Sequence, residues 1–231
     1  MKLRGGIHFN GDGIQSTVGG MSLIQKMVGV LKDNVAGFNK VGYQRNVPIV
    51  SSFAEYLGPH GVSVNKKEEV GKIKITQKPL DVALGSEGYF QVQTENGVNL
   101  TRDGRFSLDK EGYLLNLQGE KVISSEGVPL KLKTLPKNLD DIRIDKSGEI
   151  SYKAPDSFDI LKGGQISVVS AEGERLADVN IKQGYVEQSN VTLPEEIFSM
   201  MTLRRDFTAN KELFRVQNEI LTKTLQELGR A

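Results

Sequence analysis

The stretch that decides the fold lies near the end of the chain and reads TLPEEIFSMMTLRRDFTANKELFRVQNEILTKTLQEL (residues 192–228). Thr192, followed three residues later by Glu195, forms a capping-box pattern. Pro194 stands in the first turn, where its missing N–H costs little. No Gly or Pro interrupts the sequence between Pro194 and Leu228, so a single long helix is predicted there.

Apolar residues recur every seven positions along this stretch, as they do in the core of packed helices. These residues are Met200, Phe207, Phe214, Leu221 and Leu228. The companion positions, which are apolar only at the two ends, are Ile197, Arg204, Lys211, Asn218 and Leu225. A seam that is half polar suits packing in a crowded assembly better than it suits a simple dimer zipper.

A second amphipathic helix is predicted near the start of the chain. Ser22 with Gln25 repeats the capping-box pattern, and Gly37 and Gly42 mark the region where this helix should end. Its apolar stripe comprises Leu23, Ile24, Met27, Leu31, Val35 and Phe38. Residues 1–21 are rich in Gly, which raises the entropic cost of ordering, so we expect a leader of extended or loop structure there.

Residues 47–184 are predicted to form a mainly β body of antiparallel meanders, either barrel-like or sandwich-like. Residues 72–76 alternate strictly between lysine or threonine and isoleucine, which is typical of a half-buried strand. Further short strands are expected at 80–84, 89–92 and 113–115, with turns at 95–97, 103–104, 109–112 and 145–148. We therefore divide the chain into a leader (1–21), an N-terminal assembly helix with a loop (22–46), the β body and a C-terminal assembly helix (185–231).

The composition excludes several classes of function. The 30 basic and 29 acidic residues nearly cancel, which gives no electrostatic reason to expect a nucleic-acid partner. There is no Cys, so thiolate nucleophiles and Cys-based metal sites are absent. His8 and His60 stand alone, without neighbouring ligand or catalytic residues. No enzyme, cofactor, metal or small-molecule substrate is therefore indicated.

The two helices are expected to need partners outside their own chain. Most of the stability of a helix comes from packing, and a helix of some 36 residues extends about 54 Å, longer than the β body is expected to be wide. We expect both helices to be poorly ordered in the isolated chain and to pack as a coiled coil in a polymer. The apolar residues of both stripes, with Ile197 and Leu225, form the predicted assembly interface.

Four short segments point to a family. They read NKVGYQR (39–45), PLDVALGSEGYFQV (79–92), LTRDGRFSLD (100–109) and VEQSNV (186–191). In this order they resemble the motifs of the flagellar basal-body rod protein family, which belongs to the axial proteins of the hook and basal body. The matching positions are Asn39, Gly42, Tyr43, Arg45, Pro79, Leu80, Asp81, Thr101, Arg102, Asp103, Gly104, Ser189, Asn190 and Val191.

The resemblance implies a structural subunit of the bacterial flagellum. Such subunits polymerise helically into a hollow, periplasm-spanning rod that transmits torque from motor to hook, with the terminal helices inside and the β domain outside. They leave the cell through the flagellar type III export apparatus without a cleaved signal peptide. Their partners are copies of themselves and other rod or hook proteins. The chain departs from the family by its leader, and its short stretch between Arg45 and Lys78 favours a proximal over a distal rod position.

Two other classes stay open on the sequence alone. A β-rich extracellular binding module, such as an adhesin or a carbohydrate-binding domain, would account for the β body but not for the long helix. A hydrolase would need scattered catalytic residues that no linear motif reveals. At single positions, Arg102, Asp103 and Arg105 could form ion pairs between subunits or merely shape a hairpin turn, and the segments 109–112 and 145–148 fit turns better than calcium loops.

Overall fold

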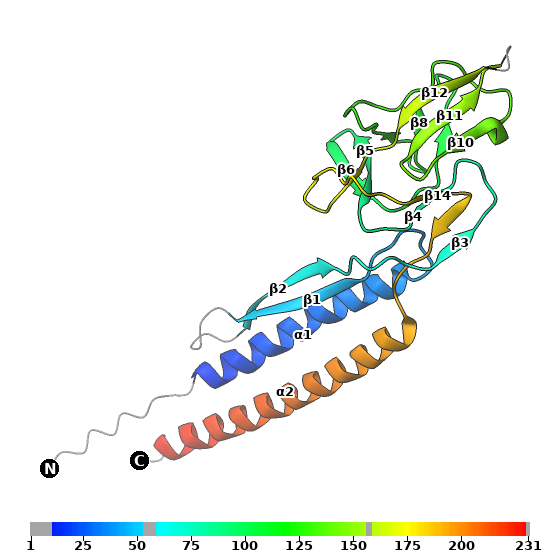
Figure 1. The fold of residues 1–231 in the computed structure, drawn as a ribbon. Coiled ribbons are helices and arrows are strands. Elements are labelled where there is room, and N and C mark those ends of the chain that lie inside the picture. Colours follow the sequence, from blue (N-terminus) through cyan, green and yellow to red (C-terminus); the bar gives the residue numbers. More distant parts are fainter. Residues whose placement is uncertain (1–10, 53–58, 156–158, 230–231) are drawn as a thin grey trace. The chain divides into compact units, whose positions relative to one another are not determined.

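The chain forms two compact units that are interleaved in sequence. The computed structural model describes residues 11–52, 59–155 and 159–229 (Figure 1). The helical unit takes the described residues of Met1–Val35, Asn46–Lys66 and Thr192–Ala231. The β unit takes Ala36–Arg45 and the described residues of Lys67–Val191. Each unit is thus assembled from segments that lie far apart in the sequence.

Two helices and one β-hairpin build the helical unit (Figure 1). The helices are α1 (Gly11–Gly37) and α2 (Leu193–Leu228), and the hairpin consists of β1 (Asn46–Ser52) and β2 (Pro59–Lys66), which pair antiparallel. The predicted C-terminal helix is confirmed, with N-cap Thr192 in an extended conformation and Pro in the first turn. No helix in the described part of the chain is long and apolar enough to cross a membrane.

The start of the first helix was predicted wrongly. α1 begins at Gly11 rather than Ser22, so the second half of the expected leader is helical. The glycines have a packing role: a Cβ at Gly13 would lie 2.9 Å from Nε2 of Gln217, and one at Gly20 would lie 3.4 Å from Nδ2 of Asn210. Small residues let the two helices approach closely, which offsets the entropic cost of glycine in a helix. Residues 1–10 lie outside the described residues.

The β unit consists of short antiparallel strands. Their bounds are β3 (Ile73–Ile75), β4 (Val82–Leu84), β5 (Tyr89–Thr94), β6 (Gly97–Thr101), β7 (Ser107–Leu108), β8 (Leu114–Leu115), β9 (Lys121–Val122), β10 (Ile142–Ile144), β11 (Glu149–Lys153), β12 (Ile160–Gln165), β13 (Val168–Val169), β14 (Ile181–Gln183) and β15 (Tyr185–Glu187), with a 3₁₀ turn at Leu139–Asp141. The largest sheet runs β13-β5-β9-β8-β7, with β6 also on β5, and β10-β11-β12 form a second sheet. β14 pairs with β4, and β15 pairs with β3. The mainly β antiparallel class is confirmed, but these sheets close no barrel within the described residues.

One apolar core holds the β unit together. It draws buried side chains from both larger sheets and from the β4–β14 pair, including Val82, Leu84, Phe90, Tyr152 and Ile181. Alternation along the strands directs these side chains inward, as in β10, where Ile142 and Ile144 are buried and the residue between them is exposed. Phe90 and Phe106 meet edge to face at 5.3 Å between ring centroids.

In the described part of the chain, five turns of one type connect the strands. In each, a Gly in the fourth position with φ between 81° and 90° donates its N–H to the carbonyl of the first residue. The side chain of that first residue also accepts the N–H two positions later. The turns begin at Asp109, Asn116, Ser124, Asp145 and Ser170. The predicted turns at 109–112 and 145–148 are confirmed as two of this set.

Candidate assembly site

The inner seam of α2 follows a heptad spacing. Residues of reduced exposure recur at alternating steps of four and three, and they are Glu196, Met200, Leu203, Phe207, Asn210, Phe214, Gln217, Leu221 and Thr224. The predicted position of Met200, Phe207, Phe214 and Leu221 therefore lies on the seam. The companion position is occupied by Leu203, Asn210 and Gln217. Of the expected companions, each one position further along the chain, Arg204 and Lys211 are exposed, whereas Asn218 is partly buried.

The centre of the seam is apolar. Ile24 and Leu31 of α1 are buried together with Leu203 of α2. Met27, Val28, Met200 and Phe207 are partly buried against these three. The two helices run antiparallel, because Gly13 lies against Gln217, whereas Asn34, near the other end of α1, bonds to Glu196. This contact joins the first and last parts of the chain.

The predicted assembly interface is divided by the structure into an inner and an outer part. Five of its residues pack within the chain: Ile24, Met27, Leu31, Met200 and Phe207. Leu23, Phe214 and Leu221 are half-buried. The exposed members are Val35, Phe38, Ile197, Leu225 and Leu228. The exposed members leave the most side-chain surface accessible to another molecule.

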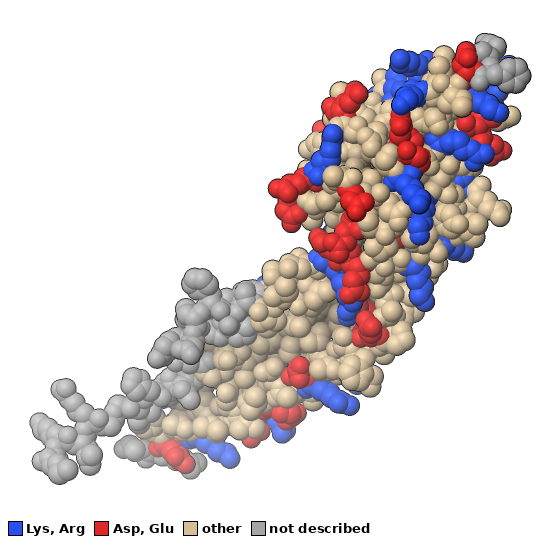
Figure 2. Space-filling model, viewed as in Figure 1, with Lys and Arg blue, Asp and Glu red and all other residues tan. Residues whose placement is uncertain are grey.

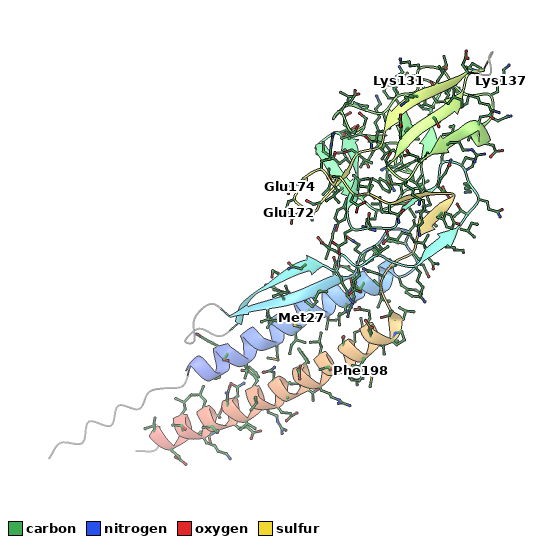
Figure 3. The ribbon with its side chains drawn as sticks, viewed as in Figure 1. Met27, Lys131, Lys137, Glu172, Glu174 and Phe198 are labelled. Carbon is green, nitrogen blue, oxygen red and sulfur yellow. The ribbon has the colours of Figure 1, made fainter. Side chains whose placement is uncertain are left out.

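A further apolar surface lies on α2, and of its residues the sequence predicted only Ile197 as part of the interface. We call it the outer face of α2 and define it as Ile197, Phe198, Met201, Leu213, Val216 and Ile220, which are between 46% and 73% exposed. Phe198 lies on the side of α2 that is turned away from α1 (Figure 3). Figure 2 shows charged side chains on this unit mainly along one edge. The heptad pattern identifies the buried seam and gives no information on the other sides of the helix, so the remaining five residues were not predicted.

A fully buried polar cluster closes one end of the seam. Nδ2 of Asn34 donates to the carbonyl of Asn46 at 2.8 Å and to Oε2 of Glu196 at 3.2 Å. Oδ1 of Asn34 accepts the N–H of Asn46 at 2.8 Å. Neither Asn34 nor Glu196 has any exposed surface. Since Asn46 begins β1, the amide side chain of Asn34 connects the hairpin to both helices.

The four family-like segments come together in the β unit and form what we call the motif junction. The N–H of Gly42 donates to the carbonyl of Glu187 at 2.8 Å, and the N–H of Asn190 donates to the carbonyl of Tyr43 at 3.3 Å. Oδ1 of Asn190 accepts the N–H of Arg45 at 2.6 Å. Its Nδ2 donates to the carbonyls of Lys67 and Glu69, at 2.8 and 2.9 Å. The Asn190 side chain thereby joins two segments of the chain.

A buried ion pair forms the centre of the motif junction. Nε of Arg102 lies 2.6 Å from Oε2 of Glu187, and the two side chains are 1% and 2% exposed. The other nitrogens of Arg102 donate to the carbonyls of Gly88 and Ser86, at 2.6 and 3.1 Å. Oε1 of Glu187 accepts the N–H of Gly71 at 2.8 Å. An ion pair between subunits is therefore ruled out for Arg102, because its guanidinium is fully engaged within its own chain.

Two polar groups beside this pair have shifted pKa values. The bidentate contact of Arg105 with Asp103, at 2.9 and 2.6 Å, raises the pKa of the Arg105 guanidinium and spans a single turn. Burial raises the pKa of the Tyr89 phenol, which donates a hydrogen bond to Oε1 of Gln44. Both contacts lie within the β unit; the first spans a single turn, and the second joins residues 45 positions apart.

At the motif junction, three glycines allow backbone segments to pack directly against one another. Gly42 has φ +68°, and a Cβ there would lie 2.5 Å from both the carbonyl carbon of Arg102 and the nitrogen of Asp103. A Cβ at Gly104 would lie 2.0 Å from the carbonyl oxygen of Val82, and one at Gly71 would lie 1.9 Å from that of Gln188. No side chain fits at these three positions.

The remaining motif residues support the same region. The carbonyls of Pro79 and Asp81 accept hydrogen bonds from Gln183 Nε2 and the N–H of Gly184, both at 2.7 Å. Thr101 Oγ1 accepts the N–H of Asp103, and Ser189 Oγ accepts that of Val191. Leu80 and Val191 are buried, whereas Asn39 is exposed.

The described residues offer little that resembles an active site. They contain no group of three or more His, Cys, Asp or Glu side chains that could hold a metal ion. His8 and the side chain of His60 lie outside the described part. Two other features stand out: the tightly packed motif junction in the β unit, and the exposed apolar outer face of α2 in the helical unit.

Comparison with known proteins agrees with this geometry. Residues 83–152 match the flagellar hook protein FlgE/F/G D1 domain, and residues 182–227 match the C-terminal domain of the flagellar basal body rod FlgEFG proteins. The flagellar basal-body rod protein FlgF of Rhizobium meliloti is 28% identical over 241 residues, which cover 94% of this chain and 98% of that protein. FlgG of Bacillus subtilis is 23% identical over 256 residues, which cover 90% of this chain and 96% of that protein.

The two family matches cover a large part of the β unit's sequence and nearly all of α2, and they give no support to an extracellular binding module. The chain belongs to the flagellar basal-body rod protein family and is a structural subunit of the basal-body rod.

Proposed function

We propose that the chain polymerises helically, with copies of itself and with other axial proteins, into a hollow shaft that carries torque from motor to hook. The observation that carries this proposal is the outer face of α2, where six large apolar side chains lie exposed on a 36-residue helix. Exposed apolar surface of this kind marks an interaction site. The hairpin adds Ile49, Val50 and Val64, each more than 40% exposed.

The same proposal assigns the two units different tasks. The β unit is held rigid by the buried pair of Arg102 and Glu187 and transmits force without changing shape. The helical unit has a small apolar seam and gains most of its order from neighbouring subunits. We infer no catalytic activity for a family of structural proteins.

Export of the unfolded chain through the flagellar type III apparatus, without a cleaved signal peptide, belongs to this proposal. The chain contains no Cys, so no disulfide has to be broken before passage or reformed afterwards. Its destination is the rod, where the terminal helices become ordered as each subunit is added.

Replacing Phe198 and Met201 together with Asp is expected to abolish rod assembly. Each change removes an apolar contact worth about 1.5–3 kcal/mol and places a charge in the buried interface, so incorporation should fall by at least about 100-fold. Swimming in soft agar and electron microscopy of isolated basal bodies measure the loss. Since both side chains are exposed, the urea unfolding curve of the purified chain should stay unchanged.

A matched control replaces two exposed apolar residues of the β unit with Asp. Leu117 and Val128 are 57% and 52% exposed, close to the 53% of Met201. Their double variant should assemble and swim. Intact rods with the Phe198→Asp/Met201→Asp protein would refute the role of the outer face.

Hydrogen exchange should show that α2 becomes ordered on assembly. Within the described residues, only three buried apolar side chains, Ile24, Leu31 and Leu203, join two helices of 27 and 36 residues. The amides of α2 should therefore exchange rapidly in the purified chain. In assembled basal bodies the same amides should be protected, while those of β5 and β11 should be protected in both samples. Equal protection of α2 in the two samples would contradict this prediction.

A further inference from the structure

The turn between β5 and β6 contains the sequence Asn96-Gly97. Thr94 pairs with Gly97, so this hairpin turns over two residues, the second of which is Asn96 (Figure 1). Asn96 and Gly97 are both exposed. Every other asparagine in the part of the chain that the structure describes is followed by a residue with a side chain, and Asn10-Gly11 begins outside that part. The β5–β6 turn is therefore the one described place where glycine follows asparagine.

The surroundings of this turn are open. Gly97 has φ +125°, and nothing lies within 4 Å of the place where its Cβ would stand. Oγ1 of Thr94 accepts the N–H of Asn96 at 3.3 Å and donates to the carbonyl of Gly97 at 2.8 Å. Within the described residues no hydrogen bond involves the carboxamide of Asn96. This carboxamide can therefore turn toward the backbone nitrogen of Gly97.

The backbone nitrogen itself lies where the ladder is easiest to open. Thr94 and Gly97 are the last pair of β5 and β6 before the turn. Exposed ends of a ladder open at little cost in free energy, so a hydrogen bond made by the N–H of Gly97 does not hold this nitrogen back for long. A following glycine also places no Cβ in the path between the nitrogen and the carboxamide.

Two groups arranged in this way can react with each other. The nitrogen of Gly97 attacks Cγ of Asn96 and forms a C–N bond that closes a succinimide ring, while Nδ2 leaves as ammonia and takes up the proton of the glycine nitrogen. One water molecule then opens the ring at either of its two carbonyls. One opening gives aspartate. The other gives isoaspartate, in which the main chain runs through the former side chain and is longer by one methylene group.

We propose that Asn96 is a site of spontaneous modification in the folded chain. Deamidation adds a negative charge next to Glu95, and isoaspartate also lengthens the backbone of the turn. Water is the only co-reactant, and it reaches the turn because Asn96 and Gly97 are exposed. The reaction needs no second subunit, so the inference does not depend on the proposed function.

Isoaspartate at this position should loosen β6 rather than β5. Within the described residues β6 pairs only with β5, whereas β5 also pairs with β9 and β13. A two-residue turn fixes the register of its hairpin, and an added methylene group no longer fits that turn. The ladder of β6 should therefore open from the turn. Its other end stays held, because Thr101 Oγ1 accepts the N–H of Asp103 at 3.0 Å.

Ageing the purified full-length chain in a mildly alkaline buffer tests the site. Mass spectrometry of proteolytic peptides follows the exchange of ammonia for water, and enzymatic methylation detects isoaspartate. Asn96 should deamidate at least about tenfold faster than any other described asparagine, because only its successor lacks a Cβ. Isoaspartate should be the main product, since direct attack of water on the carboxamide gives aspartate alone. The peptide that contains Asn10 is scored separately.

The chain offers matched controls for this measurement. Asn99 is also exposed and lies in β6, but Leu100 follows it, so it reports the rate without a glycine. Asn96→Gln should reduce the modification at the turn by at least about tenfold, because the longer side chain has to close a larger ring without a gain from the missing Cβ. Asn96→Asp carries the new charge in a backbone of normal length. Hydrogen exchange of the β6 amides should rise in the aged chain but not in freshly purified Asn96→Asp.

Equal rates of deamidation at Asn96 and Asn99, or aspartate as the sole product, would overturn the proposal. Unchanged exchange of β6 in a chain rich in isoaspartate would overturn the predicted effect on the ladder. Both readings use the purified chain and require no rod, whereas failure of the proposed function would appear as rods that form despite Phe198→Asp/Met201→Asp.

Discussion

Arg102→Met should lower the free energy of unfolding of the β unit by about 3–5 kcal/mol, the usual cost of removing one partner of a buried ion pair. The substitution leaves the Glu187 carboxylate buried, with the N–H of Gly71 still donating to it but without its cation. It also leaves the carbonyls of Gly88 and Ser86 without their donor. Urea denaturation followed by far-UV circular dichroism measures the change, and the chain's lack of Trp makes this the preferred probe.

The double variant Arg102→Met/Glu187→Met separates the charge from the packing. With no ion left in the interior, it should be more stable than Arg102→Met alone, although it loses the same ion pair. As a surface comparison, Lys162→Met breaks the exposed pair with Glu149, which is 80% exposed on the lysine side, and should change stability by less than about 1 kcal/mol. A loss below that value for Arg102→Met would show that the pair does not stabilise the junction.

Gly42→Ala should be nearly as disruptive, although it adds a single methyl group. The left-handed backbone at φ +68° costs an alanine about 1–2 kcal/mol. The Cβ would also stand 2.5 Å from backbone atoms of Arg102 and Asp103, which cannot rotate away as a side chain could. Overpacking of this kind adds about 1–3 kcal/mol, so we expect a total loss of about 2–5 kcal/mol in the same urea measurement.

Gly119→Ala is the matched control for Gly42→Ala. Gly119 has φ +81°, and nothing lies within 4 Å of the position of its Cβ. Its substitution therefore carries the conformational cost alone, and the difference between the two variants isolates the clash at the motif junction. Equal losses for both would mean that the close contact at Gly42 relaxes without cost.

Local signals in the sequence were sufficient for some elements. The bounds of α2 follow from Pro194 in the first turn and an uninterrupted run to Leu228, whereas the side chain of the N-cap Thr192 makes no capping hydrogen bond. The turns that begin at Asp109 and Asp145 follow from the side chain and the Gly that each turn requires. Such features depend on neighbours in the chain, and a sequence displays those directly.

Other features depend on contacts between distant residues and could not be predicted. The helical start of α1 depends on Gln217 and Asn210, which make the glycines at 13 and 20 useful in a helix. Arg102 looked like part of an exposed turn, because its partner Glu187 lies 85 residues away. The motif positions were recognised by resemblance, but their convergence on one junction was visible only in the fold.

The ion pair of Arg102 and Glu187 also determines when the β unit can finish folding. Because a chain is synthesised from its N-terminus, Arg102 is present long before residue 187 of 231. Until then the guanidinium cannot be buried with its partner, and β3 lacks β15, which contributes Glu187. Contacts of such long sequence separation close late and slow folding. The β unit can therefore complete this buried ion pair only after the chain is available as far as residue 187.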